Sequence, residues 1–500
     1  MTANPRASDH AEDDAAAPVV STTLGRLRGR LVAPPGQAPV HAFTGIPYAA
    51  PPIGPLRWRP PQPVQPWPGT REATGFGPDL PQAPNARLRG PHQDEDCLYL
   101  NVWTPARHDG AALPVLVWIH GGGFVGGSGS DARSDGARMA AEGAVVVSVN
   151  YRAGLFGYLA HPALSAESPE RVSGNYGLLD QLAALRWVRE HIAAFGGDAS
   201  RVTAFGVSAG SASIALMLVS PQARGLFDQC ILHSPGAGRP LASLELAERT
   251  AAEALGGDLA ALRALPAQAL FERTGRMSPR VRGLTTPRVL RPIRDGWLLP
   301  EDERPALRAG RFQRLPTIVG SNLDEGSLLT RDWPQRDLAA WRTLVEANFG
   351  AATDQALALY PAADDTQVRA RVAELFADTQ FNYGTRLIAQ AMAGAGQPTW
   401  RYLFTRRGAG QPDGPHHGEE VAHVFGNLGE AAQPMDAALS DAMRRAWVRF
   451  AATGSPEAAG SLDWKPYRPA DDNHLALGDA IAPGHGWRAE PLDFLERFYG

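Results

Sequence analysis

One serine lies between two glycines in a context that suits nucleophilic catalysis. Residues 206–210 read G-V-S-A-G, with Ser208 at the centre, between an apolar segment, 202–205, and a helix-like segment, 209–218. At a strand-to-helix turn this pattern exposes the serine hydroxyl above a sheet, beside a helix N-terminus that favours negative charge. The alternative is a small-residue helix cap without chemistry, which the flanking strand and helix patterns disfavour.

A serine hydroxyl becomes a strong nucleophile only when a base takes its proton and an acid orients that base. Behind this serine turn the usual chain order is serine, then aspartate or glutamate, then histidine. Two acids, Asp324 and Glu325, follow an apolar segment that ends at Val319, and two histidines, His416 and His417, come later. Spacing alone decides neither between the two acids nor between the two histidines.

A glycine-rich stretch supplies the third element of this chemistry. Residues 120–124 read H-G-G-G-F and follow the apolar run 115–119. Backbone N–H groups in such a loop can donate to the oxyanion of a tetrahedral intermediate, as they do in lipases and esterases. A tight turn that merely needs small residues is the alternative. The serine motif downstream favours the oxyanion site, so the motifs together predict acyl transfer through a serine.

The segments that carry these motifs alternate between strand and helix patterns. Apolar runs at 115–119, 144–149 and 202–205 indicate buried strands of a mostly parallel sheet. Apolar residues recur every three or four positions from 178 to 195, which predicts a crossover helix that ends before Gly196-Gly197. The alternation predicts a doubly wound α/β sheet.

The second half of the chain adds helices around further strands. Residues 242–378 are largely Ala/Leu/Arg helix-like sequence around a strand candidate at 316–319, which indicates inserted helices. A later strand is expected at 400–404, and a helix that Ser440 begins and Gly454 ends. No linker separates the motifs. We therefore predict a disordered tail over residues 1–20 and a single catalytic domain over residues 21–500.

Composition and charge exclude several classes of partner. Of the 500 residues 44% are hydrophobic and 20% are charged, with a formal net charge of −4. No basic cluster is dense enough to follow a phosphate backbone, so we expect no nucleic-acid partner. The apolar runs are far shorter than the roughly 20 residues of a membrane-spanning helix. We therefore expect no membrane span.

The N-terminal residues and the cysteines bear on the cellular compartment. Residues 1–17 mix acids, alanines and polar residues and lack the apolar stretch of about 7–15 residues found in a secretory signal. Cys97 and Cys230 are too few for a disulfide framework, so free buried thiols are expected, with one bridge between them as the alternative. These features predict a cytoplasmic protein. The sequence leaves open whether it is a monomer or a homodimer.

At these and many other ordered sites the chain resembles the type-B carboxylesterases, the family of cholinesterases and bacterial para-nitrobenzyl esterases. The likeness extends from about Leu24 onward. Further markers are GIPYA at 45–49, EDCLYLNV at 95–102, NYR at 150–152, GNYGLLDQ at 174–181 and FGGD at 195–198. The resemblance implies an α/β-hydrolase fold and hydrolysis of a small-molecule carboxylic ester, with neither a cofactor nor a metal.

The resemblance also assigns roles to individual residues. It implies Ser208 as the nucleophile, Glu325 as the acid of an Asp-Glu-Gly motif and His417 as the base of a His-Gly-x-Glu motif. The N–H groups of the oxyanion hole would come from Gly122, Gly123 and Ala209.

Two structural ion pairs and one departure also follow from the resemblance. Arg57 is expected to pair with Glu95, and Arg152 with Asp180, as parts of the scaffold. The family usually has glutamate immediately before the nucleophile, where this chain has Val207. A buried acid that would support the triad is therefore missing, and rate, pH profile or substrate range is expected to differ.

Other functions fit parts of the sequence. The same serine chemistry could cleave a carbamate or an amide, and a non-catalytic binding protein could share the scaffold, although such a protein would be expected to lack a triad member. A metal site could be suggested by His416, His417, Glu419, Glu420 and His423, but their spacing matches no metal motif, so no metal site is expected. Arg406-Arg407 could attract a carboxylate on the substrate, although a solvated pair is the commoner role.

Overall fold

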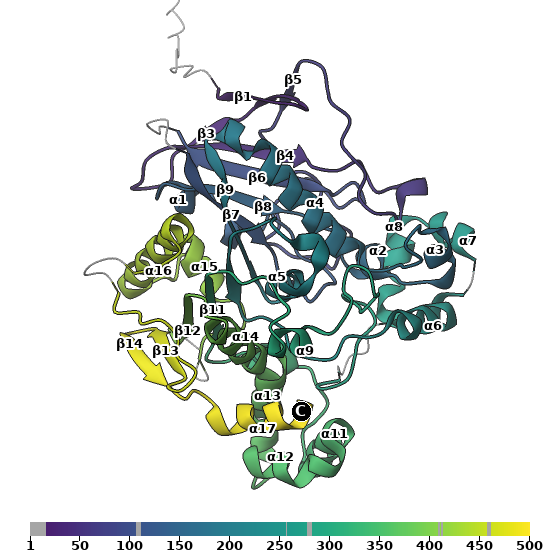
Figure 1. Ribbon diagram of the computed structural model, residues 1–500, viewed down its shortest axis with the longest axis vertical. Coiled ribbons are helices and arrows are strands. Elements are labelled where there is room, and N and C mark those ends of the chain that lie inside the picture. Colours follow the sequence, from purple (N-terminus) through teal and green to yellow (C-terminus); the bar gives the residue numbers. More distant parts are fainter. Residues whose placement is uncertain are drawn as a thin grey trace, which may run out of the picture.

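The computed structural model describes residues 17–106, 112–256, 258–277, 283–408, 411, 414–457 and 462–500 (Figure 1). Most of the tail predicted over residues 1–20 thus lies outside the described residues, and strand β1 (Val19–Thr22) includes its last two positions. No helix in these described ranges has both the length and the apolar character needed to cross a membrane.

A sheet of eleven strands forms the centre of the molecule, in the order β14-β13-β12-β11-β10-β9-β7-β8-β6-β4-β3 (Figure 1). Its neighbours from β13 to β8 are parallel, and the strands outside this run pair in the antiparallel sense. The strands span Arg30–Val32 (β3), Val40–Pro47 (β4), Tyr99–Pro105 (β6), Leu113–Ile119 (β7), Val145–Val149 (β8), Gly197–Val207 (β9), Gln229–His233 (β10), Thr317–Asn322 (β11), Thr399–Phe404 (β12), Asn473–Leu477 (β13) and Ile481–His485 (β14). A small second sheet joins β1, β2 (Gly25–Arg28) and β5 (Thr70–Glu72).

The central strands are buried on both faces, which explains their continuous apolar sequences. Successive side chains of a strand point to opposite faces. Along β7, Val115 and Val117 accordingly belong to one buried core, and Leu116 and Trp118 belong to the other. The sheet therefore separates two cores, each of which is covered by helices.

Helices α4 (Tyr176–His191) and α5 (Ala209–Val219) pack on one face, and α1 (Ala137–Ala140), α15 (Glu420–Phe425) and α16 (Pro434–Thr453) pack on the other (Figure 1). This is the predicted α/β-hydrolase fold, with a mostly parallel sheet between helices. The remaining helices span Gly154–Tyr158 (α2), Pro162–Glu167 (α3), Leu244–Leu255 (α6), Leu259–Arg263 (α7), Ala267–Phe271 (α8), Glu303–Arg308 (α9), Ser327–Thr330 (α10), Leu338–Phe349 (α11), Thr353–Leu359 (α12), Asp365–Ala377 (α13), Tyr383–Gly394 (α14) and Ala489–Tyr499 (α17).

One predicted helix boundary is wrong. Helix α16 begins at Pro434, six residues before Ser440. The side chains of Gln433 and Asp436 form a capping box at its start, and proline suits the first helical position. Ser440 lies within the helix instead, where its hydroxyl donates to the carbonyl oxygen of His423.

Three expectations about the scaffold are confirmed. Arg57 and Glu95 form a buried ion pair, with Nε 2.8 Å from Oε2. Arg152 and Asp180 form a second pair with two parallel contacts of 2.8 and 2.7 Å. Both cysteines are buried free thiols.

Candidate active site

Ser208 occupies the turn between β9 and α5, with φ 56° and ψ −116°. A positive φ is uncommon for a residue with a side chain, and such strain is concentrated at functional sites. The flanking glycines provide the space for this turn. A Cβ at Gly206 would lie 2.6 Å from the carbonyl oxygen of Ile119, and one at Gly210 would lie 2.0 Å from it. Close approach to β7 therefore requires glycine on both sides of the serine.

The register of the sheet brings the three candidate loops to one edge. In the pairing of β9, β10 and β11, Val207 lies opposite His233, and His233 lies opposite Gly320. Strand β12 continues the same parallel run. Since the carboxyl ends of parallel strands meet at the same edge, the loops after β9, β11 and β12 are neighbours there.

Glu325 and His417 are in direct contact. His417 Nδ1 lies 2.5 Å from Glu325 Oε2. The other carboxylate oxygen accepts hydrogen bonds from the hydroxyl of Ser234 at 2.5 Å and from the backbone N–H of Asn322 at 2.6 Å. The imidazole also stacks on Phe381, with ring centroids 4.2 Å apart. The acid is thus fixed by two donors, and the imidazole is fixed by the acid and the aromatic ring.

The second acid and the second histidine form a separate pair. His416 Nδ1 lies 3.2 Å from Asp324 Oδ2, while Asp324 Oδ1 accepts from the backbone N–H of Ser327 at 2.9 Å. Among the described residues that line the pocket containing Ser208 and His417, neither Asp324 nor His416 is present. Their pair joins the two loops to each other, outside that pocket.

The surroundings of His417 favour its protonated form. Burial by itself would lower the pKa of the imidazole, but the adjacent Glu325 carboxylate, assisted by Glu420, raises this pKa above the ordinary value. The Nε2 atom is buried and makes no hydrogen bond with any described residue. It is the ring nitrogen left for proton exchange with a group in the pocket.

Glu420 is a second buried carboxyl group beside this pair. Its Oε2 accepts from the side-chain amide of Asn322 at 2.6 Å, and its Oε1 lies 3.8 Å from His233 Nδ1. Burial, together with the nearby Glu325 carboxylate, raises the pKa of Glu420 to about 7. Val207, where the family usually has glutamate, is buried and apolar.

Ser234, Asn322 and Glu420 were not singled out as site residues from the sequence. Of these, Glu420 alone had a signal, because it completes the His-Gly-x-Glu motif. Ser234 and Asn322 reach Glu325 through the fold, from the end of β10 and from β11.

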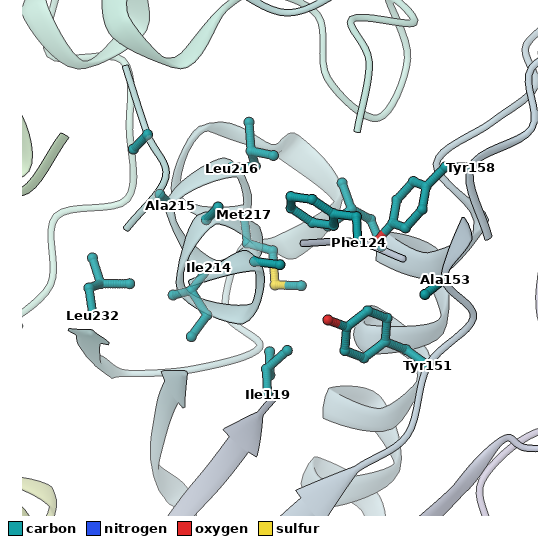
Figure 2. Close-up of a cluster of buried hydrophobic side chains, with 14 of the residues drawn as sticks. Ile119, Phe124, Tyr151, Ala153, Tyr158, Ile214, Ala215, Leu216, Met217 and Leu232 are labelled. Carbon is teal, nitrogen blue, oxygen red and sulfur yellow. The ribbon is translucent and has the colours of Figure 1, made fainter. Parts of the chain in front are cut away.

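Aromatic side chains hold the glycine-rich loop that follows β7. Gly122 and Gly123 have φ of 124° and 64°, which side chains rarely permit. The hydroxyl of Tyr151 donates to the carbonyl oxygen of His120 at 2.8 Å. Figure 2 shows Phe124 beside Tyr158, in the core that also receives Ile214 and Met217 of α5. This packing fixes the backbone of the loop relative to the helix that follows Ser208.

A cavity of about 1040 Å³ brings the predicted residues together. Its described lining includes Ser208, His417 and the three predicted oxyanion donors, Gly122, Gly123 and Ala209. Glu325 lies behind His417, fully buried. The volume is sufficient for a drug-sized organic molecule.

The remaining charged candidates have other partners. Glu419 accepts from the backbone N–H of His416 at 3.1 Å, and His423 Nε2 lies 3.4 Å from Asp436. Arg406 is held by Asp436 and by Asp479, with a contact of 2.6 Å to each. Of the two arginines that the sequence suggested for substrate attraction, Arg406 is therefore bound to two aspartates.

Comparison with known proteins gives consistent matches over nearly the whole chain. The carboxylesterase family model matches residues 16–495. Fumonisin B1 esterase from Sphingopyxis macrogoltabida is 43% identical over 468 residues, covering 90% of this chain and 86% of that protein. Para-nitrobenzyl esterase from Bacillus subtilis (strain 168) is 34% identical, covering 93% and 95%. Cocaine esterase from Oryctolagus cuniculus is 34% identical, covering 96% of each chain.

Proposed function

Because this chain belongs to the carboxylesterase family and is a carboxylic ester hydrolase, we propose that it hydrolyses small-molecule esters through an acyl-enzyme on Ser208. The main support is the contact of 2.5 Å between Glu325 and His417 Nδ1, which leaves Nε2 without a partner among the described residues, in a histidine that lines the same pocket as Ser208. A hydroxyl, an imidazole and a buried acid in this order form a nucleophile, its base and the group that orients the base.

In the first half of the reaction, His417 Nε2 accepts the hydroxyl proton as Ser208 Oγ attacks the ester carbonyl carbon. The oxyanion that forms accepts hydrogen bonds from the backbone N–H groups of the oxyanion hole, and Glu325 stabilises the imidazolium. The carbon–oxygen bond to the alcohol then breaks, and the imidazolium gives its proton to the departing oxygen. The acyl group stays on Ser208. The proposed oxyanion donors are Gly122, Gly123 and Ala209.

In the second half, water replaces the alcohol. His417 takes a proton from the water, the resulting tetrahedral intermediate uses the same donors, and the carboxylic acid leaves as Ser208 regains its proton. Each proton transfer goes through one imidazole nitrogen, so the proposed cycle needs neither a cofactor nor a metal.

Substitution of Ser208 tests this proposal. We expect Ser208→Ala to lower kcat by roughly 10⁴- to 10⁶-fold, because only oxyanion stabilisation and binding remain. The thermal unfolding midpoint should stay close to that of the wild type. Ser211→Ala is the matched control: this serine is buried on the same helix, outside the described lining of the pocket, and its loss should preserve turnover. Turnover by Ser208→Ala above a tenth of wild type would refute the proposal.

One narrower alternative shares this scaffold. Cleavage of a carbamate or amide would use the same residues, so a series with one acyl group and ester, carbamate and amide leaving groups separates them by kcat/KM. We also propose a cytoplasmic location, which the buried free thiols Cys97 and Cys230 favour.

A further inference from the structure

His417 lies in the turn before α15, and this turn is held on both sides of the histidine. On one side, the backbone carbonyl oxygen of His416 accepts from the side-chain amide of Asn322 at 2.7 Å. On the other side, the carbonyl oxygen of Gly418 accepts from Arg133 Nη1 at 3.3 Å. Asn322 belongs to β11, whereas Arg133 comes from a distant part of the chain that follows the glycine-rich loop. The turn that carries the proposed base is therefore tied to two separate segments.

Asp131 fixes the direction of the Arg133 guanidinium. Its Oδ2 lies 3.0 Å from Nη2 and its Oδ1 lies 3.3 Å from Nε, so the carboxylate and the guanidinium face each other along two contacts. Such a paired geometry restricts the orientation of both groups. With Nε and Nη2 occupied by the acid, Nη1 is the nitrogen that donates to Gly418.

The segment that carries Arg133 is itself attached at several points. Asp131 Oδ1 accepts from the backbone N–H of Arg133 at 2.9 Å and so begins a short 3-10 helix, Ala132–Ser134. The carbonyl oxygens of Arg133 and Asp135 accept from the side-chain amide of Asn427, at 3.1 and 2.9 Å. Since Asn427 follows α15 closely, this segment contacts the chain both before and after that helix.

The nucleophile side of the turn offers Gly418 an apolar neighbour instead. Gly418 has φ 81°. A Cβ added to it would meet one described atom within 4 Å besides its chain neighbours, Cγ2 of Val207 at 4.0 Å. A methyl group at that distance excludes water but forms no hydrogen bond. The polar contact that holds Gly418 comes from Arg133.

Arg133 also acts on His417 through its charge. Burial lowers the pKa of the imidazole, Glu325 from the loop after β11 and Glu420 from α15 raise it, and the Arg133 guanidinium lowers it. A cation in this position keeps more of the imidazole in the neutral form, which is the form that accepts a proton. The charge of Arg133 thus opposes the charge of the two glutamates.

The other charged groups around this turn have partners of their own. Asp131 pairs with Arg133 and also with Arg87, whose Nε lies 3.5 Å from Oδ2. Glu419 accepts from the backbone N–H of His416 at 3.1 Å, and Asp324 lies 3.2 Å from His416 Nδ1.

We propose that Arg133 is a positioning residue for His417, which it aligns with Ser208 through its hydrogen bond to Gly418. This inference rests on the acyl-enzyme function proposed above and adds a residue to its machinery. A displacement of about 1 Å between a base and its nucleophile can cost up to roughly 10²-fold in rate. A turn held at both ends keeps the imidazole in place while protons pass through Nε2.

Two variants of Arg133 separate its hydrogen bond from its charge, with 4-nitrophenyl butyrate as a neutral substrate. The Arg133 side chain is 32% exposed, so we expect both variants to fold, which the thermal unfolding midpoint checks. Arg133→Met removes the hydrogen bond and the charge. We expect kcat to fall by about tenfold with KM within about twofold of wild type, and the acidic limb of the pH profile of kcat/KM to move to higher pH.

Arg133→Lys restores the charge but not the full geometry. The midpoint of the acidic limb should return to the wild-type value, because a cation again opposes the two glutamates. The kcat should recover only in part, to within about threefold of wild type, since one ammonium group cannot make two contacts with Asp131 and reach Gly418 as the planar guanidinium does.

Arg89→Gln is the matched control. Arg89 Nε donates to the carbonyl oxygen of Ser130 at 2.9 Å, and Nη1 donates to Asp135 at 2.8 Å. Its loss therefore loosens the same segment, although Arg89 is outside the described lining of the pocket. We expect kcat within about twofold of wild type and an unchanged acidic limb.

Each outcome decides between the two proposals. An Arg133→Met variant with wild-type kcat, or with a lower kcat and an unmoved acidic limb, would overturn the positioning role and leave the ester hydrolase intact. Equal losses of kcat in Arg133→Met and Arg89→Gln would also overturn it, because loosening of the segment would then explain both. No hydrolysis by the wild type, or wild-type turnover by Ser208→Ala, would instead count against the proposed function itself.

Discussion

At the scale of single residues, the contact between Glu325 and His417 determines which ring nitrogen can act. Nδ1 faces the carboxylate, so its proton is held there and Nε2 is left to exchange protons. The carboxylate is in turn held by Ser234 and Asn322, which donate to its other oxygen. Two donors on one acceptor atom restrict the rotation of the acid and thereby the orientation of the imidazole.

The pH dependence of kcat/KM should report the state of His417. General base catalysis needs the neutral imidazole, so activity falls as the pH drops through its pKa. Glu325 raises this pKa, with support from Glu420, and the acidic limb should therefore have its midpoint above about 6.5, the value of an unperturbed histidine. A limb centred below that value would contradict the geometry described for His417.

Glu325→Gln should change both kcat and the midpoint of the acidic limb of the pH profile. The amide carries no charge to stabilise the imidazolium, so the midpoint should move to lower pH, and kcat should fall by roughly 10³- to 10⁴-fold. Asp324→Asn is the control, because Asp324 pairs with His416 outside the described lining of the pocket. If the midpoint of the acidic limb stays unchanged in Glu325→Gln, or shifts equally in Asp324→Asn, the wrong acid has been assigned.

The sequence predicted which types of residue the site contains, but spacing did not distinguish between adjacent residues of the same type. Asp324 and Glu325 are adjacent and both buried, and spacing does not say which of them contacts His417. The family motif selected Glu325, and the contact with His417 agrees with it. Glu420 was passed over because burial, which gives it a pKa of about 7, comes from the packing of the whole fold.

At the scale of elements, the strand, turn and helix from β9 to α5 fit closely against β7. The chain passes so near to the carbonyl oxygen of Ile119 that a side chain at position 206 or 210 would collide with it. Backbone atoms of a buried strand have little freedom to move away. The two glycines therefore have a structural role as strict as the chemical role of the serine between them.

Gly210→Ala tests that role. A Cβ there would lie 2.0 Å from a main-chain oxygen, so we expect the free energy of unfolding to fall by about 3 kcal/mol or more, or the protein to fail to fold. Gly394→Ala, in α14 with open space around the added carbon, should instead raise it by about 0.5–1 kcal/mol. Denaturant unfolding measures both. Equal stability of the two variants would show that the turn has more room than described.

The long apolar strands and α4 were predictable because their patterns are strong. The predicted runs at 115–119 and 144–149 correspond to β7 and β8, and β9 extends the run at 202–205 back to Gly197. Strands β13 and β14 gave less signal than the equally short β8, because their five residues each do not form a continuous apolar run. The start of α16 was missed because glutamine is not a common cap, and its effect depends on Asp436.

At the scale of the whole molecule, one sheet holds segments from the entire described chain. Both cores contain residues from the first and last fifths of the sequence, such as Phe43 and Leu492 in one and Val40 and Leu475 in the other. Separation into independent halves would break a continuous sheet. We therefore propose that the chain from about residue 19 onward is a single domain.

If the chain is a single domain, it should unfold in one transition. We expect far-UV circular dichroism and the fluorescence of the 12 tryptophans to change together in one urea transition, because no part of the sheet is stable without its neighbours. Resolved transitions, with activity lost in the first, would indicate two units and contradict the single-domain proposal.

The arginines that line the pocket from distant parts of the chain are a clear case of information held only by the whole fold. Arg239 follows β10, whereas Arg288 and Arg291 lie in a segment without helix or strand about fifty residues later. Loop lengths and composition do not fix where such segments meet. The sequence instead drew attention to Arg406-Arg407, and the structure shows Arg406 bound to two aspartates.

The most direct measurement is the location of a covalent adduct. A fluorophosphonate should inactivate the enzyme as one phosphonyl group joins each chain. Peptide sequencing by mass spectrometry should place that group on Ser208, within the tryptic peptide 202–224. Ser208→Ala should take up no label. Label on any other residue, or a labelled and active Ser208→Ala variant, would contradict the assignment of Ser208 as the nucleophile.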